Sequence, residues 1–311
     1  QVHISLAIIY YGTGKLERAI TELERAIELQ PLSDDAYRWL GRCHMRKGDL
    51  QQAVRCFNKA IEIRPRYWEN YNVLGLCYVT FGRFQDAVEQ WRRVIDIQPD
   101  NDRGYANLGS AYYHLGHYEH AVSMYKRAIE INPNPLSYSN LGTAYFYLGQ
   151  YEEAVASFQT AIEITPRDDL LHHNLGDAYL RLGRKDDAEA EFKLAIKLLN
   201  EALSVNPDDA ELLGRLAICQ AKLHIEDEAM TSINRAIALE PHNTTILYQK
   251  AVAYALTGKI EEAIEYLKQA LAAGYSRSEA ERDPDLQALH NNAKYRSIFV
   301  NGAQPEGPDQ A

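Results

Sequence analysis

Three asparagines stand at matching places in the sequence, and their side chains are suited to hold the backbone of another protein. Asn107, Asn140 and Asn174 lie 33 and 34 residues apart, and each directly precedes a leucine. A side-chain amide offers both a hydrogen-bond donor and an acceptor, so it can pair with the C=O and N–H groups of an extended peptide whatever the peptide's sequence. The alternative is that these amides bond to neighbouring helices or to water.

Five more side chains fall on the same face if this part of the chain is helical, because they follow the asparagines by three or six residues. They are predicted to contact the side chains of a bound peptide, and they are Ser110, Thr143, Asp177, Tyr113 and Phe146. The asparagine row ends at Val73 on one side and at Arg215 on the other, which limits it to three repeats.

A second group of candidate binding residues consists of three arginines spaced four residues apart. Arg38, Arg42 and Arg46 share one face of a helix at this spacing, and like charges so close repel unless an acidic group joins them. The guanidinium fork suits bidentate carboxylate recognition, which predicts a site for acidic side chains or a terminal carboxylate of a partner. The alternative is pairing within the chain, with Asp35 and Glu69.

The remaining residues give little indication of chemistry. His114, His117 and His120 surround a turn at Gly116, so they do not share a helical face, and we expect solvated histidines here and no metal site. Neither a phosphate-binding GxxxxGKS/T motif nor a nucleophile GxSxG motif is present. The sequence therefore predicts no catalytic residues, no cofactor and no enzymatic activity.

Composition narrows the class of partner. The 33 basic and 43 acidic residues give a formal net charge of -10, which opposes binding to nucleic acid or to an anionic membrane surface. No stretch approaches the roughly 18 apolar residues of a membrane-spanning helix, so direct membrane insertion is not expected. The four cysteines form no CxxC pair, which favours reduced thiols in a cytoplasmic setting. We therefore expect a protein or peptide partner, and the oligomeric state stays open.

Prolines mark the period of the elements that must position these side chains. Pro31, Pro65, Pro99 and Pro133 are 34 residues apart, and Pro166, Pro207 and Pro241 continue the series. Between successive prolines stand, in most units, an aromatic residue, a leucine followed by glycine or alanine, a turn glycine and two alanines. Glycine inside a helix costs about 1 kcal/mol relative to alanine, so its recurrence indicates that another helix approaches closely there. Each unit is predicted to be helix, turn, helix, stop.

This pattern resembles the tetratricopeptide repeat, and about eight units match over residues 1–275. The resemblance implies an all-α protein, a right-handed superhelical α-solenoid of antiparallel helix-turn-helix repeats, whose first helices line a concave groove for a partner segment. The row of Asn107, Asn140 and Asn174 resembles the asparagine ladders of O-linked N-acetylglucosamine transferase and of other tetratricopeptide proteins that bind extended peptides. The predicted function is a non-catalytic scaffold for protein–protein interaction that binds an extended peptide in this groove.

Departures from the period define the remaining boundaries. The sixth unit has 41 residues instead of 34, which predicts a second helix lengthened by about two turns near 194–206. The seventh unit has His224 in place of the turn glycine and is expected to be the most distorted. Residues 276–300 are expected to cap the array, and residues 301–311 to be disordered.

A second function stays open at this stage. The chain begins with Gln1 inside a helical pattern, which is expected of a fragment or a processed product. Residues 281–289 resemble the end of the repeat arrays that follow bacterial signalling domains. The alternative is therefore a regulatory or assembly repeat region of a larger signalling protein, a kinase, cyclase or transcription regulator, whose N-terminal domain is absent.

Overall fold

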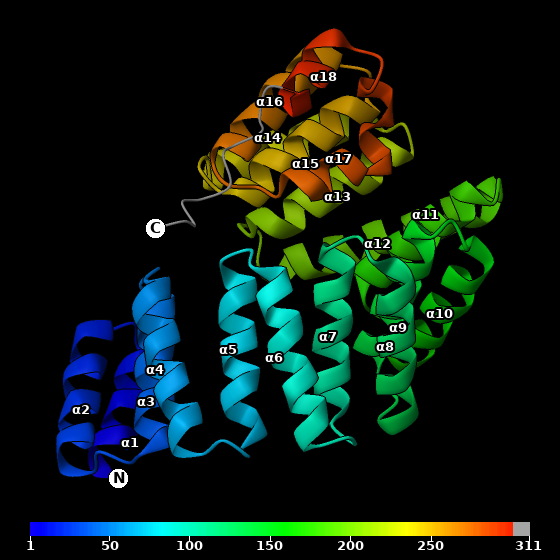
Figure 1. Cartoon of the computed structure of the whole chain (residues 1–311). Helices are drawn as coiled ribbons and strands as arrows, with labels where there is room; N and C mark the ends of the chain where they lie inside the picture. The colour runs from blue at the N-terminus through cyan, green and yellow to red at the C-terminus, as the bar shows by residue number, and fades with distance from the viewer. Residues whose placement is uncertain (301–311) are drawn as a thin grey trace. The chain divides into compact units, whose positions relative to one another are not determined.

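The structure, a computed structural model, describes residues 1–300, and every regular element within them is a helix. Sixteen helices form eight consecutive hairpins in these residues, and three short helices follow (Figure 1). The prediction of an all-α chain of helix-turn-helix repeats is therefore confirmed. None of the described helices is both long enough and apolar enough to cross a lipid bilayer. The chain divides into two compact units, residues 1–157 and 158–311, and each is described by itself.

The first unit contains nine helices and the start of a tenth. They are α1 (Val2–Gly12), α2 (Leu16–Leu29), α3 (Asp34–Arg46), α4 (Leu50–Ile63), α5 (Trp68–Thr80), α6 (Phe84–Ile97), α7 (Asp102–His114), α8 (Tyr118–Ile131), α9 (Pro135–Tyr147) and α10 (Tyr151–Ile164), inside which the division falls. The described part of the second unit continues with α11 (Asp169–Arg181), α12 (Lys185–Val205), α13 (Ala210–Lys222), α14 (Glu226–Leu239), α15 (Thr244–Leu256), α16 (Ile260–Ala272), α17 (Arg277–Arg282), η1 (Pro284–Leu289) and α18 (Ala293–Val300).

Local sequence explains where the first helices of the hairpins begin and end. Ser33, Asn101 and Asp209 cap α3, α7 and α13, because each side-chain oxygen accepts a hydrogen bond from a backbone N–H of the first turn. At the other end the turn glycine is left-handed, with φ of +81° at Gly48 and +72° at Gly183, a conformation that residues with a Cβ adopt only at a cost. Short turns therefore join the two helices of each hairpin.

The recurring glycine within the first helices is explained by the ring opposite it. A Cβ placed on Gly41 would lie 2.6 Å from the Phe57 ring, and one placed on Gly176 would lie 2.7 Å from the Phe192 ring. Both rings are buried, and each comes from the second helix of the same hairpin. The expectation that a helix approaches closely at this position is confirmed, and an aromatic side chain makes the contact.

The seventh hairpin keeps the turn of its neighbours although it lacks the turn glycine. His224 has φ +58° and is the one non-glycine residue with positive φ in residues 1–300. Its N–H donates to the carbonyl of Ala221 at 3.0 Å, just as the N–H of Gly183 donates to Leu180 at 3.0 Å. The expected distortion is therefore absent from the backbone of this turn, and the departure appears as conformational strain at His224.

Helix α12 carries the additional residues of the sixth hairpin. It has 21 residues, against 14 in α14, and it continues without interruption to Val205. Phe192, Ala195 and Leu199 are buried along it, whereas Val205 is 86% exposed. The insertion therefore lengthens the helix and carries its end into solvent.

The segment after the eighth hairpin packs against that hairpin. Leu286 and Leu289 of η1 are fully buried, in one hydrophobic cluster with Leu247 of α15 and with Ile264 and Leu267 of α16. Stacked repeats need such a cover where the array ends, because their last hairpin would otherwise expose an apolar side. The expectation of disorder over residues 301–311 concerns residues outside those that the structure describes.

Candidate functional site

In the first unit, the predicted asparagine row begins with an amide that is already partly used. Nδ2 of Asn107 donates to Oδ1 of Asn72 at 3.0 Å, and Nε1 of Trp91 donates to the same oxygen at 3.1 Å. Asn72 therefore links α5 to the next first helix, α7, and to its own hairpin partner, α6. Sequence reasoning missed Asn72 because Val73, one residue later, occupies the position that matches the asparagine row.

The other two asparagines have free amides. No side-chain hydrogen bond of Asn140 or Asn174 is formed among residues 1–300, and both side chains are half-buried on first helices, α9 in the first unit and α11 in the second. Of the predicted neighbours, Thr143 donates to the carbonyl four residues earlier at 3.0 Å, and Ser110 hydrogen-bonds to a buried tyrosine. The amides are therefore the polar groups of this set that a ligand can engage without displacing a bond within the chain.

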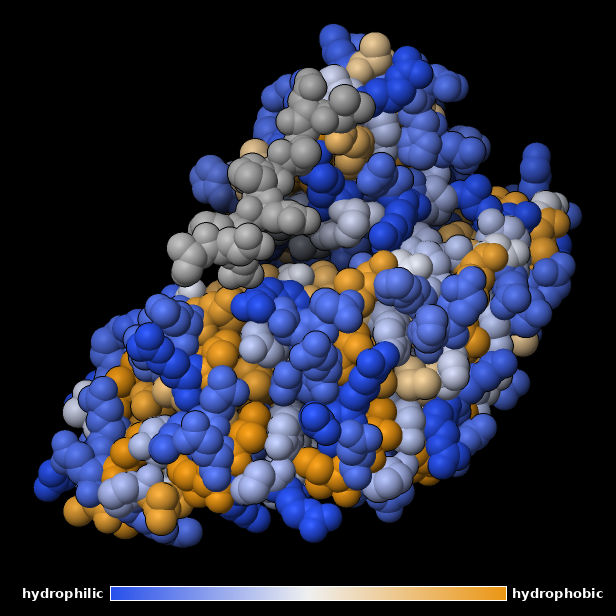
Figure 2. Space-filling model, viewed as in Figure 1, coloured by the Kyte–Doolittle hydropathy of each residue, from blue (hydrophilic) through white to orange (hydrophobic). Residues whose placement is uncertain are grey.

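The two predicted aromatic contacts belong to a cluster of rings in the first unit. Tyr113 meets Tyr147 edge-on with ring centroids 5.5 Å apart, and Phe146 meets Tyr151 in the same way at 5.5 Å. Hydrophobic and hydrophilic residues are interspersed over this unit on the face drawn in Figure 2. Apolar rings thus stand close in sequence to Asn107 and to Asn140, on the same helices α7 and α9.

The three arginines predicted to bind acidic groups are occupied within the first unit. Arg38 is buried, pairs with Asp35, and donates to a side-chain amide of α5 at 3.0 Å. Arg42 lies 3.8 Å from a carboxylate oxygen of Glu69, and Arg46 donates to a backbone carbonyl of α1 at 2.7 Å. This arrangement favours pairing within the chain. Of the three side chains, Arg46 alone is exposed.

The three histidines at the turn between α7 and α8 lie among aromatic rings. His114 stacks on Phe84 with centroids 4.6 Å apart, and His117 and His120 both contact Tyr112. In residues 1–300, no group of three or more histidine, cysteine or carboxylate side chains is placed to hold a metal ion. The three imidazoles are therefore packed against neighbouring rings and not directed at one point.

In the second unit, the predicted contact residue Asp177 belongs to a buried charge network. Its Oδ1 accepts from Nζ of Lys222 at 2.6 Å, and its Oδ2 lies 3.3 Å from Nε2 of His173. Lys222 also donates to Oδ1 of Asp285 at 2.7 Å. Burial alone would raise the pKa of Asp177, but the charges of Lys222 and His173 outweigh it and hold that pKa below its ordinary value. Asp177 thus already has two cationic partners.

Members of this network line a pocket of about 290 Å³. Its wall comes from α11, α13 and α15, together with Tyr275, Asp283 and Asp285 from the segment after the eighth hairpin. Tyr275 stacks on Tyr248 with ring centroids 3.9 Å apart, and the Tyr248 hydroxyl donates to Asp283. Burial, and then the charge of Asp285, raise the pKa of Asp283 to about 6. The pocket therefore has an aromatic side and a charged side.

One cysteine forms part of the wall of this pocket. Sγ of Cys219 lies 3.3 Å from Nδ1 of His173, whose other ring nitrogen faces Asp177. Burial would lower the pKa of His173, but Asp177 and then Cys219 raise it to about 10. Two buried atoms of the lining, Oε1 of Gln249 and Nε of Arg215, have no hydrogen-bond partner among the described residues.

The sequence holds a partial signal for this pocket that the repeat pattern obscures. Cys219 stands two residues after the small residue of its unit, as Cys43 and Cys77 do in theirs. Its partner His173 is 46 residues earlier, and the lengthened helix α12 lies between them. The usual period is 34 residues, so a separation of 46 does not indicate a contact between neighbouring hairpins. It does so only once α12 is known to be one continuous helix.

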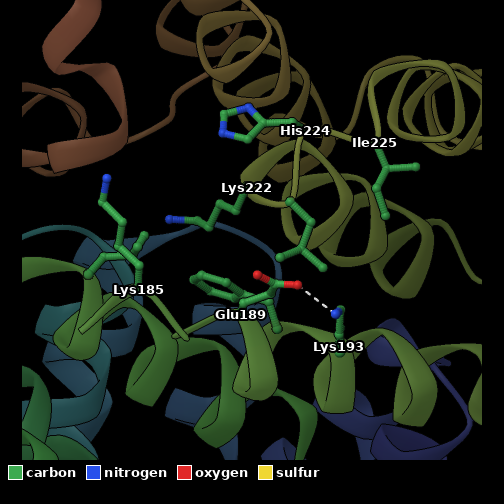
Figure 3. Close-up of a pocket in the computed structure, with 9 residues that line it drawn as sticks. Lys185, Glu189, Lys193, Lys222, His224 and Ile225 are labelled. Atoms are coloured by element: carbon green, nitrogen blue, oxygen red, sulfur yellow. Dashed lines mark hydrogen bonds and ion pairs between the residues drawn. The ribbon is translucent and has the colours of Figure 1, made fainter. Parts of the chain in front are cut away.

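A second pocket of this unit, of about 390 Å³, lies between α12 and the turn that joins α13 to α14 (Figure 3). Lys185, Glu189 and Lys193 line it from α12, and Lys193 pairs with Glu189 at 2.5 Å. Lys222 and the strained His224 line it from the other side. Most of its charged groups are cationic, but Lys193 and Lys222 are already paired with carboxylates.

Known families and curated proteins match parts of the chain. A family model described as the cilia and flagella-associated protein 70 C-terminal domain matches residues 96–282, more than half of the chain, and two described as tetratricopeptide repeat match residues 4–67 and 69–101. A peroxisomal targeting signal receptor of Yarrowia lipolytica is 31% identical over 114 residues, which make up 34% of this chain. The chain spans only 19% of that receptor's length.

Solved structures share the fold. The crystal structure of MamA is 26% identical, with a TM-score of 0.51, over 53% of this chain and 97% of that chain. A tetratricopeptide repeat protein from Parabacteroides merdae has a TM-score of 0.60 at 17% identity, over 93% of this chain and 98% of that chain. At such low identity, this second likeness shows the fold alone.

Proposed function

This chain belongs to the tetratricopeptide repeat family, whose cilia and flagella-associated protein 70 C-terminal domain model covers more than half of it, and we propose that it is a non-catalytic scaffold. In this proposal its first helices bind an extended segment of a partner protein in the cytoplasm. Repeat arrays suit this task because each hairpin presents one helix face at a regular interval to a long, thin ligand.

The observation that carries the proposal is the state of Asn140 and Asn174. Both side chains are half-buried, their amides form no hydrogen bond within the described residues, and the amide atoms stay open to a ligand. An extended backbone supplies one C=O and one N–H to each amide, which satisfies both of its functions. In the first unit, Asn107 can join Asn140 with its carbonyl oxygen, since its Nδ2 is held by Asn72.

The partner is proposed to be a protein segment bound chiefly through its backbone. The Yarrowia relative is by its name a receptor for a peroxisomal targeting signal. Recognition of acidic side chains, expected from the arginine group, is carried in this proposal by Arg46, because Arg38 and Arg42 already face carboxylates.

A comparison of two double variants tests this function. We expect Asn140→Ala with Asn174→Ala to weaken binding to an array of random unstructured peptides by about tenfold or more, since each lost amide pair is worth about 1 kcal/mol. The matched control is Asn58→Ala with Asn200→Ala, which removes two exposed amides from the second helices α4 and α12.

Circular dichroism has to show the same helix content in both double variants. Equal peptide binding by the two would assign the asparagines of the row to the solvated surface and defeat the proposal. If only the binding of acidic peptides were lost, the binding site would be assigned to the arginine group instead. An additional Arg46→Gln variant would test that assignment.

A further inference from the structure

We propose that Cys219 is an activated thiol, with His173 as its base and Asp177 behind the imidazole, and that small hydroperoxides entering the adjoining pocket modify it. The three groups form a chain of contacts from Sγ to Nδ1 at 3.3 Å and from Nε2 to Oδ2 at 3.3 Å. A nucleophile, a base and a group that orients the base is the arrangement by which proteins activate thiols. This inference is independent of peptide binding.

The pocket gives the sulfur an approach that its burial would otherwise deny. Cys219 is 1% exposed, so a reagent has to come through the cavity of about 290 Å³ that Cys219 and His173 both line. Gln249, 8% exposed, lines the same cavity, and its Oε1 accepts no hydrogen bond among the described residues. Hydrogen peroxide, which carries two O–H donors, fits a cavity of this size and can bond to the polar groups that line it.

The position of His173 is fixed by the network behind it. Asp177 holds the far ring nitrogen, and Lys222 holds the other oxygen of Asp177 at 2.6 Å. A carboxylate on one ring nitrogen makes the other a better proton acceptor and stabilises the imidazolium that forms. The proton of the pair therefore lies on Nδ1 of His173, as the cationic imidazole paired with Asp177 requires, and the sulfur beside it stands as a thiolate.

The modification balances within this set of groups. The thiolate sulfur attacks one oxygen of the hydroperoxide, an S–O bond forms and the O–O bond breaks. The departing oxygen leaves as hydroxide or alkoxide and takes the proton from Nδ1 of His173, so water or an alcohol is released. Sulfur is oxidised to a sulfenic acid, the peroxide is reduced, and His173 is left neutral until it takes up a proton from water.

The other three cysteines provide an internal reference. Cys43, Cys56 and Cys77 are buried, and burial raises the pKa of each thiol to about 11. Cys43 and Cys77 stand at the same position of their units as Cys219. A difference in reactivity between them and Cys219 therefore reports the surroundings of the sulfur and not its place in the repeat.

The charged groups that face the pair come from three parts of the second unit. They are Asp169 and Asp177 on α11, Glu211, Arg215 and Lys222 on α13, and Asp283 and Asp285 after the eighth hairpin. Asp169 is paired with Arg215, and Asp285 with Lys222. A response near pH 6 would belong to Asp283, and an Asp283→Asn variant removes it.

The experiment treats the full chain with limiting iodoacetamide and, separately, with hydrogen peroxide followed by dimedone, and locates the products by peptide mass spectrometry. We expect Cys219 to react at least about tenfold faster than the other cysteines at neutral pH. His173→Gln is expected to slow it by about tenfold or more and to make its rate rise more steeply between about pH 6 and about pH 9.

The control for loosening of α11 is His172→Gln. His172 is the neighbouring buried histidine, bonded to Glu191 at 2.6 Å, and it does not line the pocket. Equal rates at all four cysteines, or equal loss in the two histidine variants, would overturn the proposal. Faster labelling of Cys43, Cys56 and Cys77 in a variant would reveal unfolding, and Asp177→Asn would then serve as the second test of the same contact.

Discussion

The same position of the repeat carries two different structures in the two units. Three residues before the small residue of the first helix stands Arg38 in the first unit and His173 in the second. Arg38 is closed off by Asp35 and by an amide of the next first helix, whereas His173 faces a thiol and a pocket. The repeat therefore fixes where a side chain lies. The residues around it determine whether it only stabilises the packing of the helices or can form a reactive site.

The largest effect is expected from the charge network that distinguishes the second unit. Lys222→Met leaves Asp177 and Asp285 without their cation, and because the lysine side chain is only 3% exposed, we expect a loss of about 3–5 kcal/mol in the free energy of unfolding. Denaturant titration measures it. The matched control is Arg25→Met in the first unit, whose exposed pair with Glu28 contributes less than about 1 kcal/mol.

The pH dependence of stability should also differ between the two units, because Asp283 belongs to the second. The folded pKa of Asp283 is about 6, above its ordinary 3.8, so the folded state binds a proton that the unfolded state has released between these values. We therefore expect stability to rise by about 1–3 kcal/mol as pH falls from about 6 to about 4. Asp283→Asn should abolish this rise, and an unchanged pH profile in that variant would contradict the assignment.

The recurring glycines within the first helices test whether the hairpins of the two units are packed in the same way. Gly41→Ala and Gly176→Ala place a Cβ 2.6 Å and 2.7 Å from a buried ring, so each should cost about 1–3 kcal/mol, by similar amounts. Gly12→Ala is the control, because nothing lies within 4 Å of a Cβ there. Thermal unfolding would show the two losses, and a loss in one unit alone would mean that the hairpins are not packed alike.

The smallest effect concerns the strained turn of the seventh hairpin. His224→Gly should stabilise the chain by about 0.5–1 kcal/mol, because relief of a left-handed histidine outweighs the greater freedom of glycine in the unfolded chain. Gly183→Ala at the equivalent turn should destabilise it by a similar amount. Destabilisation by His224→Gly would show that the imidazole makes a contact at the turn that offsets its strain.

The fold was largely predictable because its determinants are local and repeat. The proline period, the turn glycines and the small residues opposite aromatic rings each act within one hairpin, so their meaning follows from short stretches of sequence. The turn at His224 was misjudged for the same reason: hydrogen bonds to Ala221 and from Ile225 to Gln220 hold the backbone although its usual residue is missing.

The candidate sites were predictable only where the surroundings of a side chain follow the 34-residue period of the sequence. The amides of Asn140 and Asn174 form no hydrogen bond within the described residues, and whether a peptide binds them stays a proposal. Asn72 and the pairing of Asp177 depend on contacts between helices of different hairpins. The pocket beside Cys219 depends further on Asp283 and Asp285, which lie outside the repeat and carry no periodic signal.

The lengthened helix α12 has an angular consequence. Seven residues at about 100° each turn a helix through about 700°, which is only about 20° short of two full rotations, while they advance its end by about 10.5 Å. The chain therefore enters α13 on nearly the same azimuth as it would without the insertion. Seven residues can therefore be added to or removed from this helix with little change in the direction in which the chain leaves it. A change of five residues would point the following hairpin about 140° away from its partner.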